Sequence, residues 1–395
     1  MQSATKLVHI SRRFAQGHGI SDAGPAVAPA GPTHAGEFRL LSRAAVNETF
    51  ELWRARPRAG ARACGLERPA APRSRDAAWT KAYSAQAART VGLAHPHLVE
   101  VLAVNRAEGG GPFVIEEWID GLALDAPAAQ DLPPRLALFV VAQAARGLGH
   151  AHRAGWVHGA LTPGDIRIGW DGAVKVARVG RAVVGATGLS GRSTDPLVHE
   201  QLPYLSPEHV SGEAIAASAD VYGLGIILYA LLSGEVPFKA SSDLMTARAV
   251  LENAAPRLGA RIPGLPSDVE TIVERALFKH PNDRPGGVEP MIAALESALD
   301  SGPPVEQSDL ADLLAARREG QVHRFDRAPF AFPAPAGLVP AGPEAGVRPR
   351  PGPTTERFRR RWVRPREQPL PWILFFAATA ALLGWVASGG LRWGS

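Results

Sequence analysis

The sequence predicts an α+β fold of two lobes, a small β-rich lobe and a larger helical lobe, followed by one transmembrane helix. Three patterns support this: short strand-like apolar runs before residue 120, long helical patterns from 133 to 280, and an uncharged stretch from Gln368 to Leu391. The 395 residues then divide into a flexible segment 1–36, a folded domain 37–300, a tether 301–370 rich in Pro, Ala and Arg, a transmembrane helix 371–391 and a short tail 392–395.

The folded domain begins with its small lobe. Strand-like runs occupy 38–42, 50–56, 62–67, 97–104 and 112–119, and a helical pattern runs from Ala77 to Leu93. The larger lobe follows with helical patterns at 133–155, 219–234 and 268–280. Apolar spacing at 308–320 indicates one short amphipathic helix inside the tether.

The stretch near the C-terminus has the length and flanks of a membrane span. About 20 apolar residues in a helix rise about 30 Å, enough to cross a bilayer core. A buried soluble helix is the weaker alternative, because WILFFAATAALLGWVASGG is apolar all round and flanked by Trp. We therefore expect Trp372–Leu391 to lie in the membrane.

The charges around this span predict its orientation. A basic cluster could bind nucleic acid, but next to an apolar span it favours the positive-inside rule, which places the folded domain in the cytoplasm at the inner membrane. No apolar core follows Lys6, so no secretory signal is visible. We expect no nucleic-acid partner. The cluster before the span comprises Arg357, Arg359, Arg360, Arg361, Arg364 and Arg366, and only Arg392 follows it.

The single cysteine, Cys64, excludes an internal disulfide and fits a reducing compartment. A small apolar residue in a strand is a better interpretation of Cys64 than a reactive thiol.

Several segments of the larger lobe identify a family resemblance. They are VHGALTPGDIRI (157–168), VKVARVGRA (174–182), PYLSPEHVSG (203–212), SADVYGLGIILYALLSGEVPF (218–238) and HPNDRP (280–285). Their order and spacing resemble those of eukaryotic-like Ser/Thr protein kinases, above all bacterial membrane-anchored ones. The resemblance implies a protein-kinase fold, in which ATP, magnesium and a few placed charges normally carry out phosphoryl transfer.

The nucleotide-binding positions of the family are replaced in this chain. Ala45, Asn47 and Phe50 align with the glycines of the phosphate loop, and a Phe side chain there would block backbone approach to phosphates. The lysine of the third family strand aligns with Gly65, or with Leu66 if the register slips by one. The helix glutamate that positions this lysine aligns with Gln86.

The catalytic positions are depleted as well. The catalytic aspartate aligns with Ala160, and the neighbouring family arginine and lysine with Gly159 and Thr162. The metal-binding asparagine aligns with Asp165, which keeps a carboxylate. The Asp of Asp-Phe-Gly aligns with Arg178, whose charge would repel magnesium but attract a bare phosphate.

A second set of family positions is retained. By the resemblance these residues support the fold: one braces the catalytic loop, and a Glu and an Arg form a buried ion pair. The retained residues are His158, Gly180, Pro207, Glu208, Asp220, Gly225 and Arg284.

We therefore predict a pseudokinase with no catalytic, cofactor-binding or metal-binding residues, for which binding of ATP and magnesium is lost. It would act by protein binding, as scaffold or regulator of an active kinase or of a membrane complex. The alternative is an active or atypical Ser/Thr kinase that uses a displaced lysine such as Lys81.

Smaller signals receive structural interpretations. Polar residues near Arg192 could be phosphorylated, but the family arginine that would bind the phosphate is Gly159. Three histidines lack metal-ligand spacing. These residues are Ser190, Ser193 and Thr194, and His95, His150 and His152.

Overall fold

The computed structural model describes residues 34–46, 49–60, 62–71, 73–106, 111–180 and 201–319. All of them fall within the first of two compact units of the chain, Met1–Ala334. Within these residues no helix is long and apolar enough to span a membrane. The predicted span 371–391 lies outside them, as do its arginine cluster, Asn47 and the serines and threonine near Arg192.

The small lobe is built on an antiparallel sheet with the strand order β1-β2-β3-β4-β6-β5. Alternate side chains point to one face, where Phe38, Trp53, Leu66 and Ile115 form an apolar core. The strands are β1 (His34–Ala35), β2 (Phe38–Val46), β3 (Phe50–Pro57), β4 (Cys64–Pro69), β5 (Val101–Arg106) and β6 (Pro112–Glu117).

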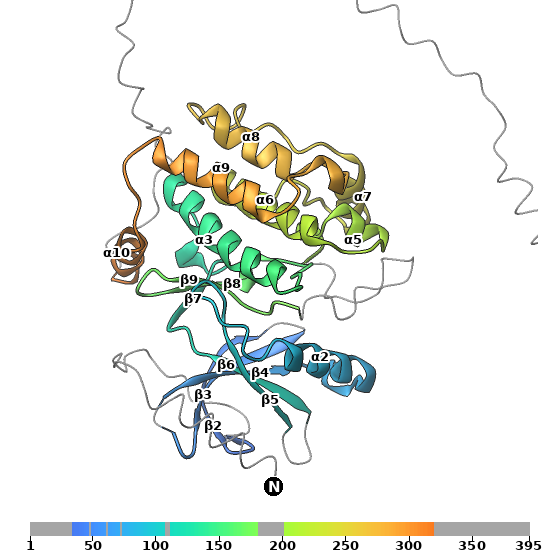
Figure 1. Cartoon of the computed structure of the whole chain (residues 1–395), viewed down its shortest axis with the longest axis vertical. Helices are drawn as coiled ribbons and strands as arrows, with labels where there is room; N and C mark the ends of the chain where they lie inside the picture. Colours follow the sequence, from blue (N-terminus) through green and yellow to red (C-terminus); the bar gives the residue numbers. More distant parts are fainter. Residues whose placement is uncertain are drawn as a thin grey trace, which may run out of the picture. The chain divides into compact units, whose positions relative to one another are not determined.

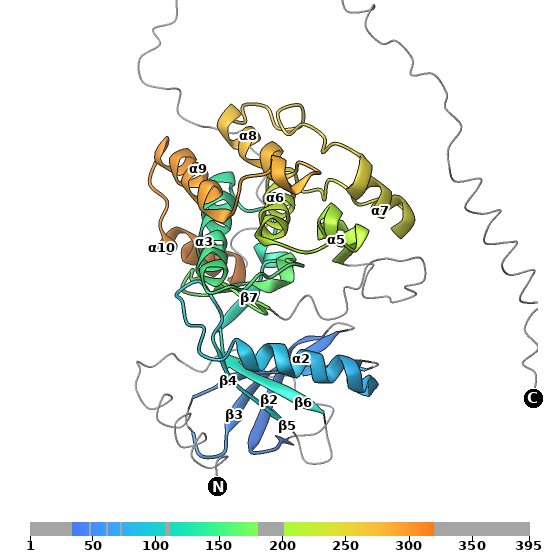
Figure 2. The ribbon, with the colours of Figure 1, turned by 45° about the vertical axis from the view of Figure 1, so that its right-hand side comes forward.

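Helix α2 (Ala77–Arg89) packs against β5 and β6 and lies across the sheet in both views (Figures 1 and 2). The Asp76 side chain caps its N-terminus by accepting a hydrogen bond from the Trp79 backbone N–H at 2.9 Å. Trp79 and Tyr83, one turn apart, are buried and stacked, with ring centroids 5.2 Å apart. This apolar face fixes the helix on the sheet and directs Tyr83 toward β4.

The large lobe forms around the apolar helices α3 and α6, with α8 and α9 packed beside them (Figure 1). Gly225 on α6 allows close approach of α8, since a Cβ there would lie 2.7 Å from the Ala276 Cβ. A short sheet, β7-β8-β9, lies between these helices and the small lobe. The helices are α3 (Pro134–Arg153), α5 (Pro207–Ser211), α6 (Ala217–Ser233), α7 (Asp243–Glu252), α8 (Ser267–Ala276) and α9 (Val288–Asp300), and the strands are β7 (Gly121–Ala123), β8 (Ile166–Gly169) and β9 (Val174–Val176).

Helix α10 (Gln307–Arg318) belongs to the packed domain, although the sequence analysis assigned its residues to the tether. Leu310 and Leu314 are fully buried in the core of the large lobe. The Arg317 guanidinium donates hydrogen bonds of 2.7–2.8 Å to the carbonyls of Ala128, Gln130 and Asp131. The folded part of the chain therefore continues beyond residue 300.

Cys64 lies in the core of the small-lobe sheet and is 0% exposed. Burial, together with the charge of Glu116, raises the pKa of its thiol to about 12. A thiol held protonated and away from solvent behaves as a small apolar group.

Candidate functional site

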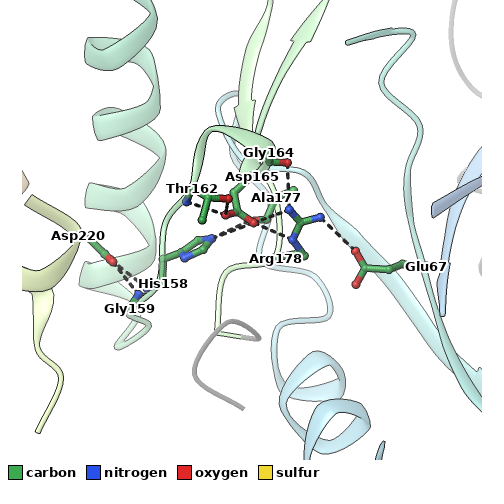
Figure 3. Close-up of polar contacts among 9 residues, drawn as sticks. All are labelled: Glu67, His158, Gly159, Thr162, Gly164, Asp165, Ala177, Arg178 and Asp220. Atoms are coloured by element: carbon green, nitrogen blue, oxygen red, sulfur yellow. Dashed lines mark hydrogen bonds and ion pairs between the residues drawn. The ribbon is translucent and has the colours of Figure 1, made fainter. Parts of the chain in front are cut away.

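The segment between α3 and β8 contains the positions of the family's catalytic loop. The Asp220 carboxylate on α6 accepts hydrogen bonds from the backbone N–H groups of His158 (2.9 Å) and Gly159 (2.7 Å) (Figure 3). The His152 Nε2 also lies 2.7 Å from this carboxylate. Gly159 has a φ of +83°, a conformation that glycine adopts without strain. Asp220 thus fixes the path of the loop, while Ala160 offers only a buried methyl group where the catalytic aspartate would stand.

Asp165, at the metal-binding position, is saturated by contacts from its own lobe. One carboxylate oxygen accepts from both the backbone N–H (2.8 Å) and the hydroxyl (2.7 Å) of Thr162. The other accepts from the Arg178 Nε at 2.7 Å and lies 3.7 Å from the His158 Nε2 (Figure 3). Burial alone would raise the pKa of Asp165, but the Arg178 charge, with His158 and Thr162, holds that pKa far below its usual range.

Arg178, at the position of the Asp in Asp-Phe-Gly, is the centre of the site. Its guanidinium lies 2.6 Å from Asp165, donates to the Gly164 carbonyl at 3.0 Å and lies 3.6 Å from the Glu67 carboxylate (Figure 3). The ring centroid of Phe50 lies 4.0 Å from the Arg178 Cζ, a cation–π contact. The backbone of Arg178 has a φ of +60°, unusual for a non-glycine residue. Contacts from both lobes therefore hold this side chain inside the cleft.

Glu67 is a site residue that the sequence analysis missed. It is 0% exposed, and its carboxylate accepts a hydrogen bond of 2.7 Å from the Tyr83 hydroxyl of α2 while facing Arg178. The sequence offered Gly65 or Leu66 for the lysine position of this strand. Leu66 points into the sheet core, whereas alternation puts residues 65 and 67 on the cleft side. A glutamate inside an apolar strand was the signal that could have revealed Glu67.

The other predicted positions are distributed as follows. Gly65 pairs with Glu116 of β6, and a Cβ at residue 65 would lie 2.8 Å from the Glu116 Cγ. The α2 residue that reaches β4 is Tyr83, one turn before Gln86. Lys81, the displaced lysine of the alternative prediction, is exposed on α2. Ala45 of β2 lines a cavity between the lobes, and Phe50 covers Arg178.

The charges of the cleft are inverted relative to those of the family. By the family pattern a strand lysine and the aspartate of Asp-Phe-Gly face the nucleotide. Here Glu67 is the buried strand residue facing residue 178, and Arg178 stands at the aspartate position. The two changes compensate each other, so the pair remains neutral without nucleotide or metal.

These residues do not fit a magnesium–ATP complex. Magnesium requires oxygen ligands, but the Asp165 oxygens are bound by four protein donors, two from Thr162 and two from the Arg178 guanidinium. Among the described residues no group of three or more His, Cys, Asp or Glu side chains could hold a metal ion.

The retained scaffold residues Glu208 and Arg284 form a buried bidentate ion pair, with both N–O distances 2.7 Å. Arg284 also donates to the carbonyls of Phe278, Ser218 and Lys279 at 2.8–3.0 Å. Burial would raise the pKa of Glu208, but its hydrogen bonds with Arg284 keep that pKa below the ordinary value. The pair joins α5 to the segment before α9.

The remaining retained residues have structural contacts. The His158 ring contacts the Ala177 carbonyl at 3.2 Å. Gly180 has a φ of +71°, and a Cβ there would lie 2.8 Å from the Trp156 ring. Pro207 is buried at the first position of α5. His95 and His150 are not among the retained family residues, but they too have a structural contact: their rings stack with centroids 4.8 Å apart.

Comparison with known proteins places the chain in a family. The profile described as Protein kinase domain matches residues 78–296, more than half of the chain, so the chain belongs to this family. Serine/threonine-protein kinase PknB of Mycobacterium tuberculosis is 32% identical over 245 residues, which are 60% of this chain and 39% of PknB. PknL of the same organism is 33% identical over 195 residues, 49% of this chain and 48% of PknL. The chain thus spans less than half the length of these curated relatives.

Solved structures share the fold. The M. tuberculosis PknI kinase domain superposes with a TM-score of 0.54 at 21% identity, covering 69% of this chain and 99% of that chain. The predicted family resemblance and the two-lobe kinase-like fold are therefore confirmed.

Proposed function

We propose that this protein is a catalytically inactive member of the protein kinase family that acts through protein binding, as a scaffold or regulator of signalling. It would be held at the inner membrane by the segment Trp372–Leu391, with the kinase-like domain in the cytoplasm. Its partner would be a protein, either an active kinase or a membrane complex.

The observation that supports inactivity most strongly is the position of Arg178. Its guanidinium stands at the family position of the aspartate that would hold magnesium, between Asp165 of the large lobe and Glu67 of the small lobe. Removing it from the cleft would leave two buried carboxylates without their counter-ion, a change that costs about 3–5 kcal/mol for buried pairs. Nucleotide binding would have to supply this free energy before any phosphate could enter.

The decisive experiment measures nucleotide binding by thermal unfolding of the purified full-length chain. At a micromolar Kd, millimolar ATP would stabilise the protein by about 4 kcal/mol. We expect no upward shift of the Tm with ATP and magnesium, while PknB treated in the same way serves as the positive control. A magnesium-dependent shift of several degrees would contradict the proposal.

The membrane part of the proposal is tested by separating anchor from domain. Anchoring raises the effective concentration of the domain for membrane-bound partners. A truncation ending near Pro353 removes the arginine cluster and the span, and we expect it to fold but to lose function in the cell. An unrelated anchor in the same orientation should restore function. Full complementation by the soluble truncation would show that membrane recruitment is not required.

A further inference from the structure

The small lobe carries an excess of positive charge over β2, β3 and β4. Residues 37–69 contain seven arginines and four glutamates. Two of the glutamates are used inside the lobe: Glu67 is buried against Tyr83, and the Glu51 carboxylate binds the Arg68 guanidinium at 2.7 and 2.9 Å. The seven arginines are Arg39, Arg43, Arg54, Arg56, Arg58, Arg62 and Arg68.

The two lobes differ in the sign of their charge. Among the described residues, those up to Glu117 include 12 arginines or lysines and seven aspartates or glutamates. The described residues from Trp118 onward include 15 basic and 22 acidic residues of these types. The described domain is therefore positive at the small lobe and negative at the large lobe. A surface of negative charge attracts the first and repels the second.

Strand pairing brings several of the arginines together. Arg39 of β2 and Arg56 of β3 are cross-strand partners, and Arg54 follows on the same face of β3. Like charges directly opposite each other destabilise a strand pair, so an anionic surface would stabilise this arrangement. Both views place β2 and β3 on the side of the small lobe remote from α8 and α9 (Figures 1 and 2).

Three arginines of this region are accessible to a partner. Arg39, Arg43 and Arg58 are exposed, and among the described residues their guanidinium groups form no ion pair. The Arg43 guanidinium lies over the Trp53 ring, 5.9 Å from its centroid, a contact that leaves its charge unneutralised. A guanidinium binds phosphate oxygens through two parallel hydrogen bonds. Phosphate groups displayed on a surface therefore match these side chains.

We infer that the arginine surface of β2 and β3, comprising Arg39, Arg43, Arg54, Arg56 and Arg58, docks on anionic lipid headgroups of the membrane. Anionic leaflets attract basic segments held beside them. The inference rests on the proposed function, because the proposed membrane anchor would hold this surface next to such headgroups, which favours lipid over nucleic acid as the anion. The small lobe would face the bilayer. The large lobe, with its excess of carboxylates, would face the cytoplasm, where protein partners can reach it.

The test measures which lobe approaches the bilayer when the full-length chain is reconstituted in lipid nanodiscs. The discs contain phosphatidylcholine with or without phosphatidylglycerol, together with a lipid that carries a fluorescence quencher on its headgroup. A fluorophore is attached at Ala59→Cys, next to Arg58, or at Ser241→Cys, an exposed position of the large lobe. The native Cys64 is 0% exposed and does not compete for the label.

We expect the label at residue 59 to be quenched in discs that contain phosphatidylglycerol. Quenching should be weaker in phosphatidylcholine alone, and weaker at residue 241 in both kinds of disc. Salt at about 1 M should remove the difference, because the screening length then falls to about 3 Å.

Neutralising arginines tests the surface itself. A triple variant of the small lobe should lower the ratio of docked to undocked domain on the order of a hundredfold, about fivefold for each arginine. A matched triple variant of exposed arginines in the large lobe should not weaken docking. The first variant combines Arg39→Gln, Arg43→Gln and Arg58→Gln, and the second combines Arg248→Gln, Arg257→Gln and Arg275→Gln.

Equal quenching at the two positions, equal quenching with and without phosphatidylglycerol, or equal loss in the two triple variants would each overturn the inference. A label at residue 59 that responds to duplex DNA but not to phosphatidylglycerol would identify nucleic acid as the anion instead. If the small-lobe variant does not fold, the wild-type comparison of the two lipid compositions still decides. A chain that does not remain in the discs would overturn the proposed anchor as well, whereas insertion without quenching at residue 59 would overturn only the docking.

Discussion

Two buried ionic groups in this domain make an instructive comparison. The pair Glu208–Arg284 keeps the residues that the family uses and links elements within the large lobe. The cluster of Arg178 with Asp165 and Glu67 keeps the location of the family's active site but exchanges its charges, and it joins the two lobes. Both groups are buried and have partners, so both are compatible with a stable fold. Only the first keeps the residue types that the family has at these positions.

The difference between the two groups bears on the proposed loss of nucleotide binding. An active site must leave charges available for phosphate and metal, whereas a scaffold must satisfy every buried charge internally. In this chain the Arg178 guanidinium is bound internally, by Asp165 and by the Gly164 carbonyl, as the proposed loss of magnesium binding would require.

The largest effect is expected at the scaffold pair. Glu208→Ala leaves Arg284 buried without its carboxylate and should lower the free energy of unfolding by about 3–5 kcal/mol. Thermal or urea unfolding of the protein, followed by a signal from the large lobe, measures this change in the free energy of unfolding. The control is Glu252→Ala, which removes an exposed partner of Arg248 and should change stability by less than about 1 kcal/mol. An unchanged Tm for Glu208→Ala would refute the structural role of the pair.

A charge exchange tests the cleft cluster. Arg178→Asp places a third carboxylate beside Asp165 and Glu67 and should be strongly destabilising. Adding Glu67→Lys restores opposite charges and should recover part of the loss, with a coupling energy of about 0.5–3 kcal/mol in a double-mutant cycle. The measurement is the free energy of unfolding of the wild type, of the two single variants and of the double variant.

The matched control for this cycle pairs Arg178→Asp with Glu289→Lys, at a surface residue bound to Arg153. This second substitution should give no recovery. Equal stabilities of the single Arg178→Asp variant and its Glu67→Lys double variant would show that residues 67 and 178 do not interact.

The smallest effect on stability is expected when the pH is lowered. The pKa values of Glu208 and Asp165 are depressed in the folded protein, so the unfolded chain takes up protons first as the pH falls. The stability that these carboxylates provide is fully present above their ordinary pKa of about 4 and is lost progressively below it. The stability difference between wild type and Glu208→Gln should therefore narrow from pH 7 to pH 3 in urea titrations. A difference independent of pH would contradict the ionised state of Glu208.

The sequence by itself determined the family, the two-lobe architecture and most helices, because ordered motifs and 3.6-residue periodicity are local properties. It also predicted which family positions are replaced, but it left the strand lysine between Gly65 and Leu66 and did not single out Glu67. Helix α10 was visible as an amphipathic pattern, but its membership of the domain was not, because Leu310 and Leu314 meet their neighbours only in the folded chain.

Only the tertiary structure decided what fills the cleft. The partnership of Arg178 with Glu67 joins residues far apart in sequence, and its existence depends on how the lobes are placed. From the sequence we expected the charge of Arg178 to attract a phosphate. In the folded chain Asp165, the Gly164 carbonyl and Phe50 surround this side chain instead. Electrostatic partners are chosen by distance in space and by burial, and a sequence contains neither.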